Sequence, residues 1–144
     1  MNNLSTHGWS LSHPLQKITQ GEWNRENMNG RLREVDRIEI LTLMDNYVDI
    51  LLGSTKVVRR ASHSGGGEIF SDTLVGEHGL SLLVTVRDGG NEHTVLFDTG
   101  YSAVGVPHNM KQLGLDLNKI EAIVLSHGHM DHLGALNVLL EKMP

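Results

Sequence analysis

The pattern of hydrophobic and polar positions divides the chain near residue 37. Residues 1–36 are polar, rich in Asn, Gln and Ser, and show no sustained apolar period. Segments of this composition bury too little apolar surface to order themselves, so we expect a flexible N-terminal extension without recognisable chemistry. Trp9 and Trp23 are the residues in it that could pin it onto the domain. The folded domain is expected over residues 37–144.

Strands are the first elements that the pattern predicts in this domain. Residues 38–44 have strand composition and end at Asp45-Asn46, a pair typical of turns. Two further strands, at residues 80–87 and 94–97, flank the sequence Asp-Gly-Gly-Asn. Its Asp-Gly and Gly-Gly steps are typical of a hairpin turn, so these two strands are expected to pair.

The second half of the domain mixes helix and strand signals. Apolar positions 106, 110 and 113 predict a short helix that Gly114 ends. The uninterrupted apolar run at residues 122–125 predicts a buried strand. Leucines at helical spacing after residue 132 predict one further helix. By contrast, residues 57–69 contain three successive glycines and are expected to form a mobile loop, with a lid over a site as one role for it.

Composition and charge narrow the classes of function. The chain has no cysteine, which excludes disulfides, thiolate catalysis and Cys-type zinc sites. The net charge of −5 and the scattered Lys and Arg residues argue against nucleic acid as a partner. No apolar stretch approaches the roughly 18 residues of a membrane span, and the N-terminus lacks a secretory pattern. We therefore expect a cytoplasmic protein that has no membrane partner.

One cluster carries most of the chemistry, in the sequence His127-Gly-His129-Met-Asp131-His132. On an extended loop, alternate residues lie on the same side, so His127 and His129 are expected to converge. Asp131 and His132 follow where the chain turns into a helix. Imidazole and carboxylate donors suit zinc first, with iron or manganese as alternatives. The cluster predicts one or two metal ions, because paired ions are the usual use of such crowded ligands.

The sequence SHGHMDH after an apolar strand, with LFDTG some thirty residues before it, resembles the metallo-β-lactamase superfamily. The segments at residues 45–46, 77–83 and 109–117 further resemble the branch of ribofuranosylaminobenzene phosphate pterin synthase. The resemblance covers residues 38–143. It implies an α/β fold, the N-terminal half of an αββα sandwich, with a mixed sheet and helices on one face. It also implies a dinuclear metal site at one edge of the sheet.

This resemblance implies a role for each ligand-type residue. His127 and His129 would bind the first metal, and Asp131 and His132 the second. Asp98 of LFDTG would support the site from behind the ligands, although a plain turn at the end of a strand would explain it too. Asp131 would also be catalytic.

Three residues outside these motifs are further candidates. His78 would be catalytic through a substrate contact near the metals, or would only cap a turn. Asp45 and Asn46 would bind substrate, or would only form an Asx turn. We expect His63, His93 and His108 to be solvated.

The expected function is a metal-dependent hydrolase acting on a small-molecule ester, amide or phosphate through a metal-bound hydroxide. The family's remaining ligands follow this motif, and only twelve residues follow His132. We therefore expect a second polypeptide, a second copy, or the missing C-terminal half of a longer chain to complete the fold. The alternative from another class is a non-catalytic metal-binding interaction module. A redox di-iron site is a third alternative.

Overall fold

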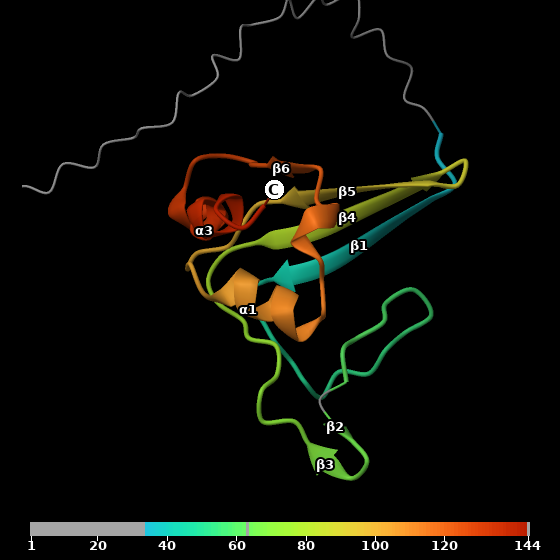
Figure 1. The fold of residues 1–144 in the computed structure, drawn as a ribbon. Helices are drawn as coiled ribbons and strands as arrows, with labels where there is room; N and C mark the ends of the chain where they lie inside the picture. Colours follow the sequence, from blue (N-terminus) through green and yellow to red (C-terminus); the bar gives the residue numbers. More distant parts are fainter. Residues whose placement is uncertain (1–33, 63, 144) are drawn as a thin grey trace, which may run out of the picture. The chain divides into compact units, whose positions relative to one another are not determined.

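The computed structural model describes residues 34–62 and 64–143. Its main sheet has four strands in the order β1-β4-β5-β6 (Figure 1). These are β1 (Arg37–Met44), β4 (Ser81–Asp88), β5 (Asn91–Phe97) and β6 (Ala122–Val124). The first three pair antiparallel and β6 pairs parallel with β5, so the sheet is mixed, as predicted. The expected N-terminal extension covers residues 1–36, and residues 1–33 of it lie outside the described part of the chain.

The β4–β5 hairpin forms where the turn sequence predicted it. Gly89 and Gly90 both have positive φ, 57° and 83°, as a two-residue hairpin turn with the twist of the strands requires. Asp88 pairs with Asn91 at its base, and the register continues to Leu82 opposite Phe97. Strand β5 therefore begins three residues earlier than the apolar pattern indicated, because the polar residues at its start still form ladder pairs.

Four helical segments accompany the sheet: α1 (Gly105–Gln112), the 3-10 turn η1 (Leu117–Lys119), α2 (Met130–Leu133) and α3 (Leu136–Leu140). The predicted end of α1 is confirmed, since Gly114 has φ +64° and the Leu115 N–H donates to the Met110 carbonyl at 2.9 Å.

The helix expected after residue 132 is present as α3, but it begins only at Leu136, and the separate helix α2 ends before it at Leu133. The N–H groups of Gly134 and Ala135 donate instead to the carbonyls of Gly100 and Thr99, at 2.8 and 3.3 Å. A helix cannot run through a point where its amide groups bond outside it.

Residues 57–69 contain more regular structure than a glycine-rich loop indicated. Strands β2 (Ser64–Gly65) and β3 (Glu68–Ile69) form a small antiparallel ribbon. Gly66 and Gly67, with φ of +63° and +88°, make the turn between them. The glycines therefore close a hairpin. Figure 1 shows this ribbon projecting away from the main sheet.

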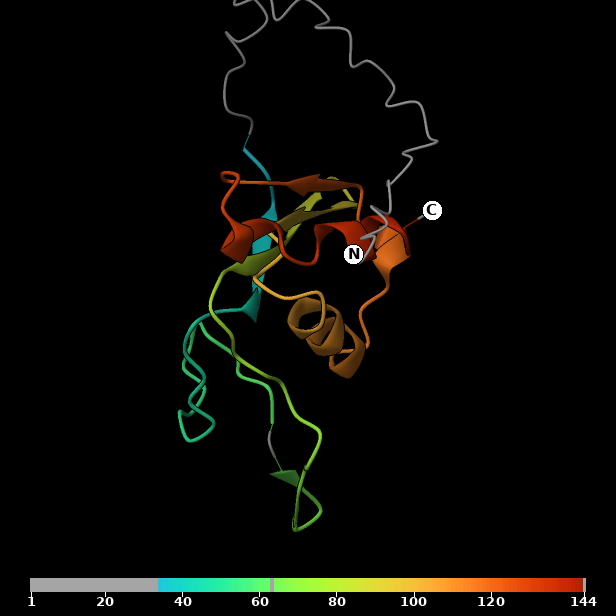
Figure 2. The same ribbon diagram turned by 90° about the vertical axis from the view of Figure 1, so that its left-hand side faces the viewer.

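The core lies on one face of the sheet, against the helices. Its buried residues come from the strands and helices together: Leu43, Met44, Leu83, Leu96, Val106, Met110, Ile120, Ala135 and Leu139. Both α1 and α3 contribute to this cluster, so they cover the same face (Figure 2). The prediction of a mixed sheet with helices on one face is confirmed.

The opposite face of the sheet is apolar and open in the part of the chain that the structure describes. We call it the uncovered face; it carries Ile38, Ile40, Leu82, Val84, Val95, Phe97 and Val124, which the strand registers place on one side. Ile40 is 63% exposed and Val124 43%. The expected burial of residues 122–125 is therefore wrong here, because β6 is an edge strand and the described residues place nothing over this face.

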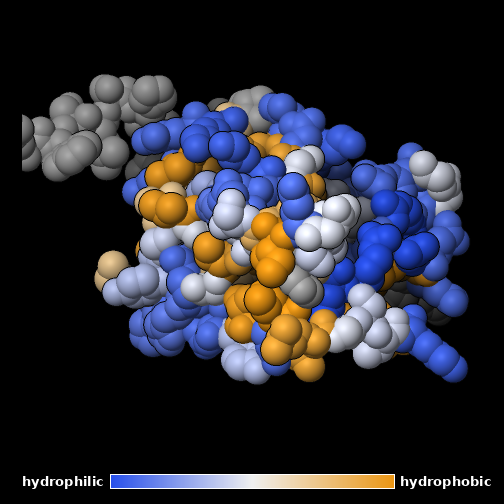
Figure 3. Space-filling view, turned by 90° about the horizontal axis from the view of Figure 1, so that it is seen from below, coloured by the Kyte–Doolittle hydropathy of each residue, from blue (hydrophilic) through white to orange (hydrophobic). Residues whose placement is uncertain are grey.

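Apolar side chains are also exposed in the connection between β1 and β4, where Leu51 is 85% and Val57 92% exposed. Figure 3 views the molecule from the end where this connection lies, and apolar surface runs through the middle of that view between hydrophilic margins. None of the helices in the described residues has the length and apolar character to cross a membrane.

Candidate metal centre

Four segments with candidate site residues meet at one edge of the main sheet. They follow β1, precede β4, follow β5 and follow β6. Because β4 runs antiparallel to both β1 and β5, and β6 runs parallel to β5, these four strand ends lie at the same edge. Edges where strands end are the usual places for ligands in open α/β sheets. The topology therefore gathers residues that are as much as 87 positions apart (from Asp45 to His132) in the chain.

The loops after β5 and β6 are bonded directly to each other. The Thr99 N–H donates to the His132 carbonyl at 2.7 Å, and the Gly134 N–H donates to the Gly100 carbonyl at 2.8 Å. Only glycine fits at position 134, because a Cβ there would stand 1.8 Å from the Tyr101 carbonyl oxygen. This close approach explains why a glycine follows the cluster at position 134. Together with the Thr99 hydrogen bond, it holds the His132 backbone against the loop after β5.

Asp98 lies buried beneath the cluster and has no exposed surface. Its carboxylate accepts the Ser126 N–H at 2.7 Å, the Ser126 hydroxyl at 2.8 Å and the His132 Nδ1 at 2.7 Å. Burial acts to raise the pKa of Asp98, but the hydrogen bonds from Ser126 and His132 outweigh it, so the pKa lies below its usual value. Asp98 is a carboxylate that supports other side chains, in the position the resemblance implied.

The backbone of Asp98 is also unusual. Its φ of +56° makes it the only described residue other than glycine in the left-handed region. That conformation costs a side-chain-bearing residue about 1 kcal/mol or more. Such local strain is typical of residues whose position serves a site, since the surrounding structure has to hold them in place.

These bonds determine which ring nitrogen of two histidines carries the proton. A carboxylate only accepts, so His132 donates from Nδ1 to Asp98. The Ser126 hydroxyl gives its proton to Asp98, so it accepts from Nδ1 of His127, 2.9 Å away. In the neutral rings, Nε2 of both histidines therefore keeps its lone pair. Fixing one ring nitrogen so that the other can bind is the usual arrangement of metal-binding histidines.

The ligand atoms of the cluster lie in two pairs. His127 Nε2 is 2.9 Å from His129 Nδ1, and His132 Nε2 is 3.4 Å from Asp131 Oδ2. The resemblance implied the same two pairs as ligands of a first and a second metal, and that assignment remains a prediction. Nitrogen and oxygen donors of this kind suit zinc, iron or manganese. Across residues 34–62 and 64–143, however, no three such side chains converge enough to hold an ion as they stand.

The other candidates lie beside the second pair. His78 Nε2 is 3.4 Å from Asp131 Oδ2, and His78 Nδ1 is 3.1 Å from Asn46 Oδ1. The Asp45 carboxylate instead accepts the Asn46 N–H at 2.7 Å, within its own turn. The structure thus brings Asn46 and His78 to the cluster and leaves Asp45 in a local contact. Their catalytic and substrate-binding roles remain predictions.

The remaining histidines differ from one another. His93 is exposed and its Nδ1 lies 3.0 Å from the Glu121 carboxylate, away from the cluster. The expectation that His108 is solvated is wrong, because its side chain is only 25% exposed and its Nε2 lies 2.8 Å from the Thr73 carbonyl. The position of His63 lies outside the described residues. Of these three histidines, only His93 is shown to be exposed and away from the cluster, so it is the one suited to control experiments.

Sequence reasoning missed Ser126, the residue that links Asp98 to His127. It stands directly before the first ligand in SHGHMDH, so its adjacency was visible in the sequence. Its contact with Asp98 was not visible, because the two residues are 28 positions apart.

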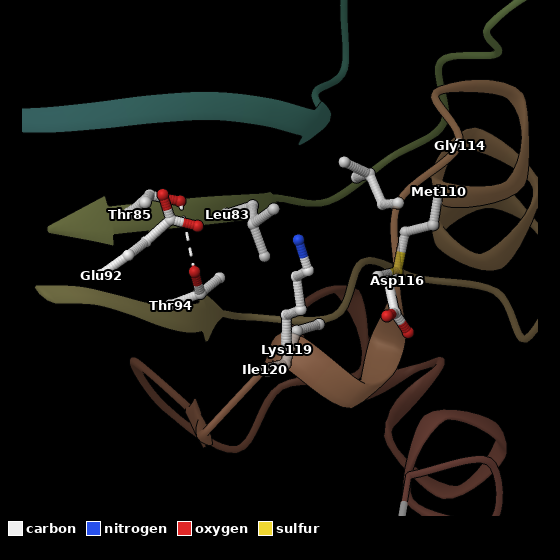
Figure 4. A pocket seen from close by; sticks show the side chains of 10 residues that line it. Leu83, Thr85, Glu92, Thr94, Met110, Gly114, Asp116, Lys119 and Ile120 are labelled. Carbon is white, nitrogen blue, oxygen red and sulfur yellow. Dashed lines mark hydrogen bonds between the residues drawn. The ribbon is translucent and has the colours of Figure 1, made fainter. Parts of the chain in front are cut away.

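A hollow of about 210 Å³ lies between the sheet and α1, lined by Leu83, Thr94, Met110, Lys119 and Ile120 among others (Figure 4). None of its lining residues belongs to the cluster. A second hollow of about 520 Å³ lies beside α1 and α3, and none of its lining residues belongs to the cluster either. The candidate metal ligands therefore lie outside both hollows, at the open edge of the sheet.

Comparison with known proteins relates the chain to one family. The family model described as the metallo-beta-lactamase superfamily matches residues 74–143. The 7,8-dihydropterin-6-methyl-4-(beta-D-ribofuranosyl)-aminobenzene-5'-phosphate synthase of Methanocaldococcus jannaschii is 30% identical over 110 residues, 76% of this chain and 31% of that protein. The anti-Pycsar protein Apyc1 of Bacillus phage vB_BsuM-Goe3 is 36% identical over 72 residues, 50% of this chain and 24% of that protein.

Among solved structures, the MIM-2 metallo-beta-lactamase aligns with 49% of this chain and 28% of its own, at 23% identity and a TM-score of 0.33. The chain spans less than a third of the length of the two relatives above. The stretch that the family model matches contains His78, Asp98 and the whole cluster from His127 to His132. Residues 74–143 of this chain therefore match the metallo-beta-lactamase superfamily, and 110 residues of the chain are similar to the synthase.

Proposed function

We propose that this chain is part of a metal-dependent hydrolase that acts on a small-molecule ester, amide or phosphate. The observation that carries the proposal is that His127 Nε2 and His129 Nδ1 face each other at 2.9 Å. The other ring nitrogen of His127, Nδ1, is held by the Ser126 hydroxyl, which donates in turn to Asp98. Histidines in an ordinary surface turn are not expected to have their tautomers fixed by a buried carboxylate, so this arrangement favours metal binding.

The residues fit zinc best, with iron or manganese as alternatives, as one or two ions. A divalent ion there supplies a Lewis acid that polarises a carbonyl or phosphoryl group and activates water. His127 and His129 would hold the first ion, and His132 with Asp131 the second. Asp131 would also orient the attacking water by accepting a hydrogen bond from it, and Asp98 would keep His132 aligned.

One relative favours a phosphate among these substrate classes. The name of the synthase describes a phosphate on a ribofuranosyl group. Because that protein is a synthase, the same site could support transfer as well as hydrolysis, and function depends on the site more than on the fold.

We further propose that additional polypeptide packs against this chain in the active species. It would come from a second chain, a second copy or the missing C-terminal half of a longer protein. The uncovered face supports this, since Ile38 and Ile40 are 57% and 63% exposed on it. Large exposed apolar faces mark interaction surfaces. The chain also spans only 31% of the synthase. The added layer would bring further His and Asp ligands, because each ion needs three or more protein ligands.

The second candidate function is a non-catalytic metal-binding interaction module. The finding that favours it is the lack, among the described side chains, of any three that could hold an ion together. Such a module would bind metal and a partner protein without turning over substrate.

An assay on size-separated protein distinguishes the two candidates. The full chain would be fractionated with zinc or manganese present, and each fraction tested on a chromogenic phosphodiester, a nitrophenyl ester and a β-lactam. We expect hydrolysis in a species larger than the 15.9 kDa chain, loss to background in His129→Ala and no change in His93→Ala. Metal-loaded fractions that hydrolyse none of the three would favour the interaction module. Equal activity of the two variants would contradict the assigned site.

A further inference from the structure

Tyr101 lies in the loop after β5, and the backbone on both sides of it is held by hydrogen bonds. On one side, the Gly100 carbonyl accepts the Gly134 N–H at 2.8 Å. On the other side, the Ser102 N–H donates to the Glu77 carboxylate at 3.0 Å. Segments before β4 and after the cluster therefore fix the point from which the Tyr101 side chain extends.

The Tyr101 backbone is also packed closely against the loop before β4. A Cβ on Gly79 would stand 3.1 Å from the Tyr101 nitrogen and 2.3 Å from the Asp131 carbonyl oxygen. Gly79 has a φ of +122°, in the region that favours glycine. It therefore fits between the backbones of Tyr101 and Asp131, where a larger residue would push the two apart.

The Tyr101 ring lies beside the cluster, next to His78. The two ring centroids are 6.1 Å apart and the ring planes are inclined at 61°, which is an edge contact. His78 Nε2 in turn lies 3.4 Å from Asp131 Oδ2. The Asn46 Oδ1, 3.1 Å from His78 Nδ1, holds the His78 ring in this orientation. Tyr101 and Asp131 therefore both adjoin one histidine whose ring is fixed.

The fold makes little use of the Tyr101 ring. The residue is 50% exposed and does not belong to the core cluster. Within residues 34–62 and 64–143 its hydroxyl has no hydrogen-bond partner, whereas the hydroxyl of Tyr47 lies 3.1 Å from Asp49 Oδ2. A tyrosine on a fixed backbone offers a large contact area and loses little entropy on binding, because only two side-chain torsions remain to be ordered. Such a ring beside a candidate site is suited to contact a ligand.

We propose that Tyr101 is a substrate-binding residue, and that it selects substrates with an aromatic ring next to the reacting ester or phosphate group. Aromatic rings attract one another in edge-to-face and offset arrangements, because their faces are negative and their edges positive. Aromatic side chains are also common in the walls of ligand sites. The inference rests on the proposed hydrolase function and deepens it by naming aryl esters and aryl phosphates as the substrate class.

Binding of phosphonates tests this without turnover, because their carbon–phosphorus bond takes the place of the ester bond. Calorimetry on the full-length chain with zinc present would compare phenylphosphonate with cyclohexylphosphonate, which has a ring of similar size that is not aromatic. We expect the wild type to bind phenylphosphonate about fivefold more tightly than cyclohexylphosphonate. Tyr101→Phe should keep this preference, and Tyr101→Leu should lose it.

Phe70→Leu is the matched control. Phe70 is also a half-exposed aromatic residue, at 46%, but its ring lies against Gly65 in the β2–β3 ribbon. This variant should keep the preference of the wild type. Methylphosphonate, which has no ring, should bind the wild type and Tyr101→Leu equally, and this shows that the rest of the site is intact.

Three results would overturn the inference while leaving the hydrolase in place. The first is the same phenyl preference in Tyr101→Leu as in the wild type. The second is loss of methylphosphonate binding in Tyr101→Leu, because Tyr101 would then hold the site together. The third is an unchanged preference with a changed assembly mass in Tyr101→Leu, which would assign the ring to a contact with additional polypeptide. A zinc-loaded wild type that binds none of the phosphonates would overturn the phosphate-directed function and the inference together.

Discussion

At the scale of single residues, Asp98 connects the fold to the candidate metal centre. Asp98 directly follows the last residue of β5 and has a backbone in the left-handed region. Its carboxylate accepts three hydrogen bonds from Ser126 and His132. Through those bonds it determines the tautomer of His132 directly and that of His127 through the Ser126 hydroxyl. One buried carboxylate thus prepares one ligand of each proposed metal position.

Replacing Asp98 with Asn should weaken metal binding without unfolding the domain. The amide N–H₂ would face His132 Nδ1, which would then have to accept and place its proton on Nε2. We expect zinc affinity to fall by about 10–100-fold, measured by calorimetry. Asp72→Asn is the control, because among the described residues its exposed carboxylate contacts only Gln112 and His108. Equal affinities for the two variants would show that Asp98 does not control the ligands.

The candidate ligands could be picked out from the sequence because they stand within six residues of one another. Asp98 was also predictable, since LFDTG accompanies the cluster in the family that the sequence resembles. The contact between Asn46 and His78 was not, because it joins residues 32 positions apart. Only the antiparallel pairing of β1 with β4 brings their ends together, and no local pattern encodes that register.

At the scale of elements, the apolar spacing predicted helix α1, but it did not predict the contact that anchors this helix to its neighbours. Asn109, on the same helix, is 2% exposed. Its Nδ2 donates to the Leu43 and Val75 carbonyls at 2.7 and 2.8 Å, and its Oδ1 accepts the Val75 N–H at 2.9 Å. A periodicity argument treats a polar residue as solvent-facing, so this buried amide was outside its reach.

Asn109→Ala should therefore cost much more stability than substitution of an exposed asparagine. The buried Leu43 carbonyl and the partly buried backbone groups of Val75 would lose their partner, so we expect the free energy of unfolding to fall by about 2 kcal/mol. Denaturant unfolding measures this, with Asn118→Ala as the control, because the Asn118 side chain bonds only to nearby Asp116 within residues 34–62 and 64–143. A difference below about 0.5 kcal/mol between the two variants would contradict the anchoring role.

At the scale of the whole molecule, the alternation within β4 and β5 predicted paired strands but not which faces would be covered. Leu83 and Leu96 face the helices, whereas Val84 and Val95 lie on the uncovered face. The sequence of β6 has the same apolar character on both faces. Whether such a face is covered depends on polypeptide outside these strands, so no pattern within them could decide it.

The central claim is that this chain binds metal through the cluster of His127, His129, Asp131 and His132. Elemental analysis of the full-length chain, purified without chelator and dialysed against metal-free buffer, tests it most directly. The account predicts about one to two bound ions of zinc, iron or manganese for each complete site, that is, for each copy of the cluster with all of its ligands present. That content should be retained in His93→Ala and strongly reduced in the double variant His127→Ala/His129→Ala. A wild-type chain without metal, or equal metal content in all three proteins, would contradict the account.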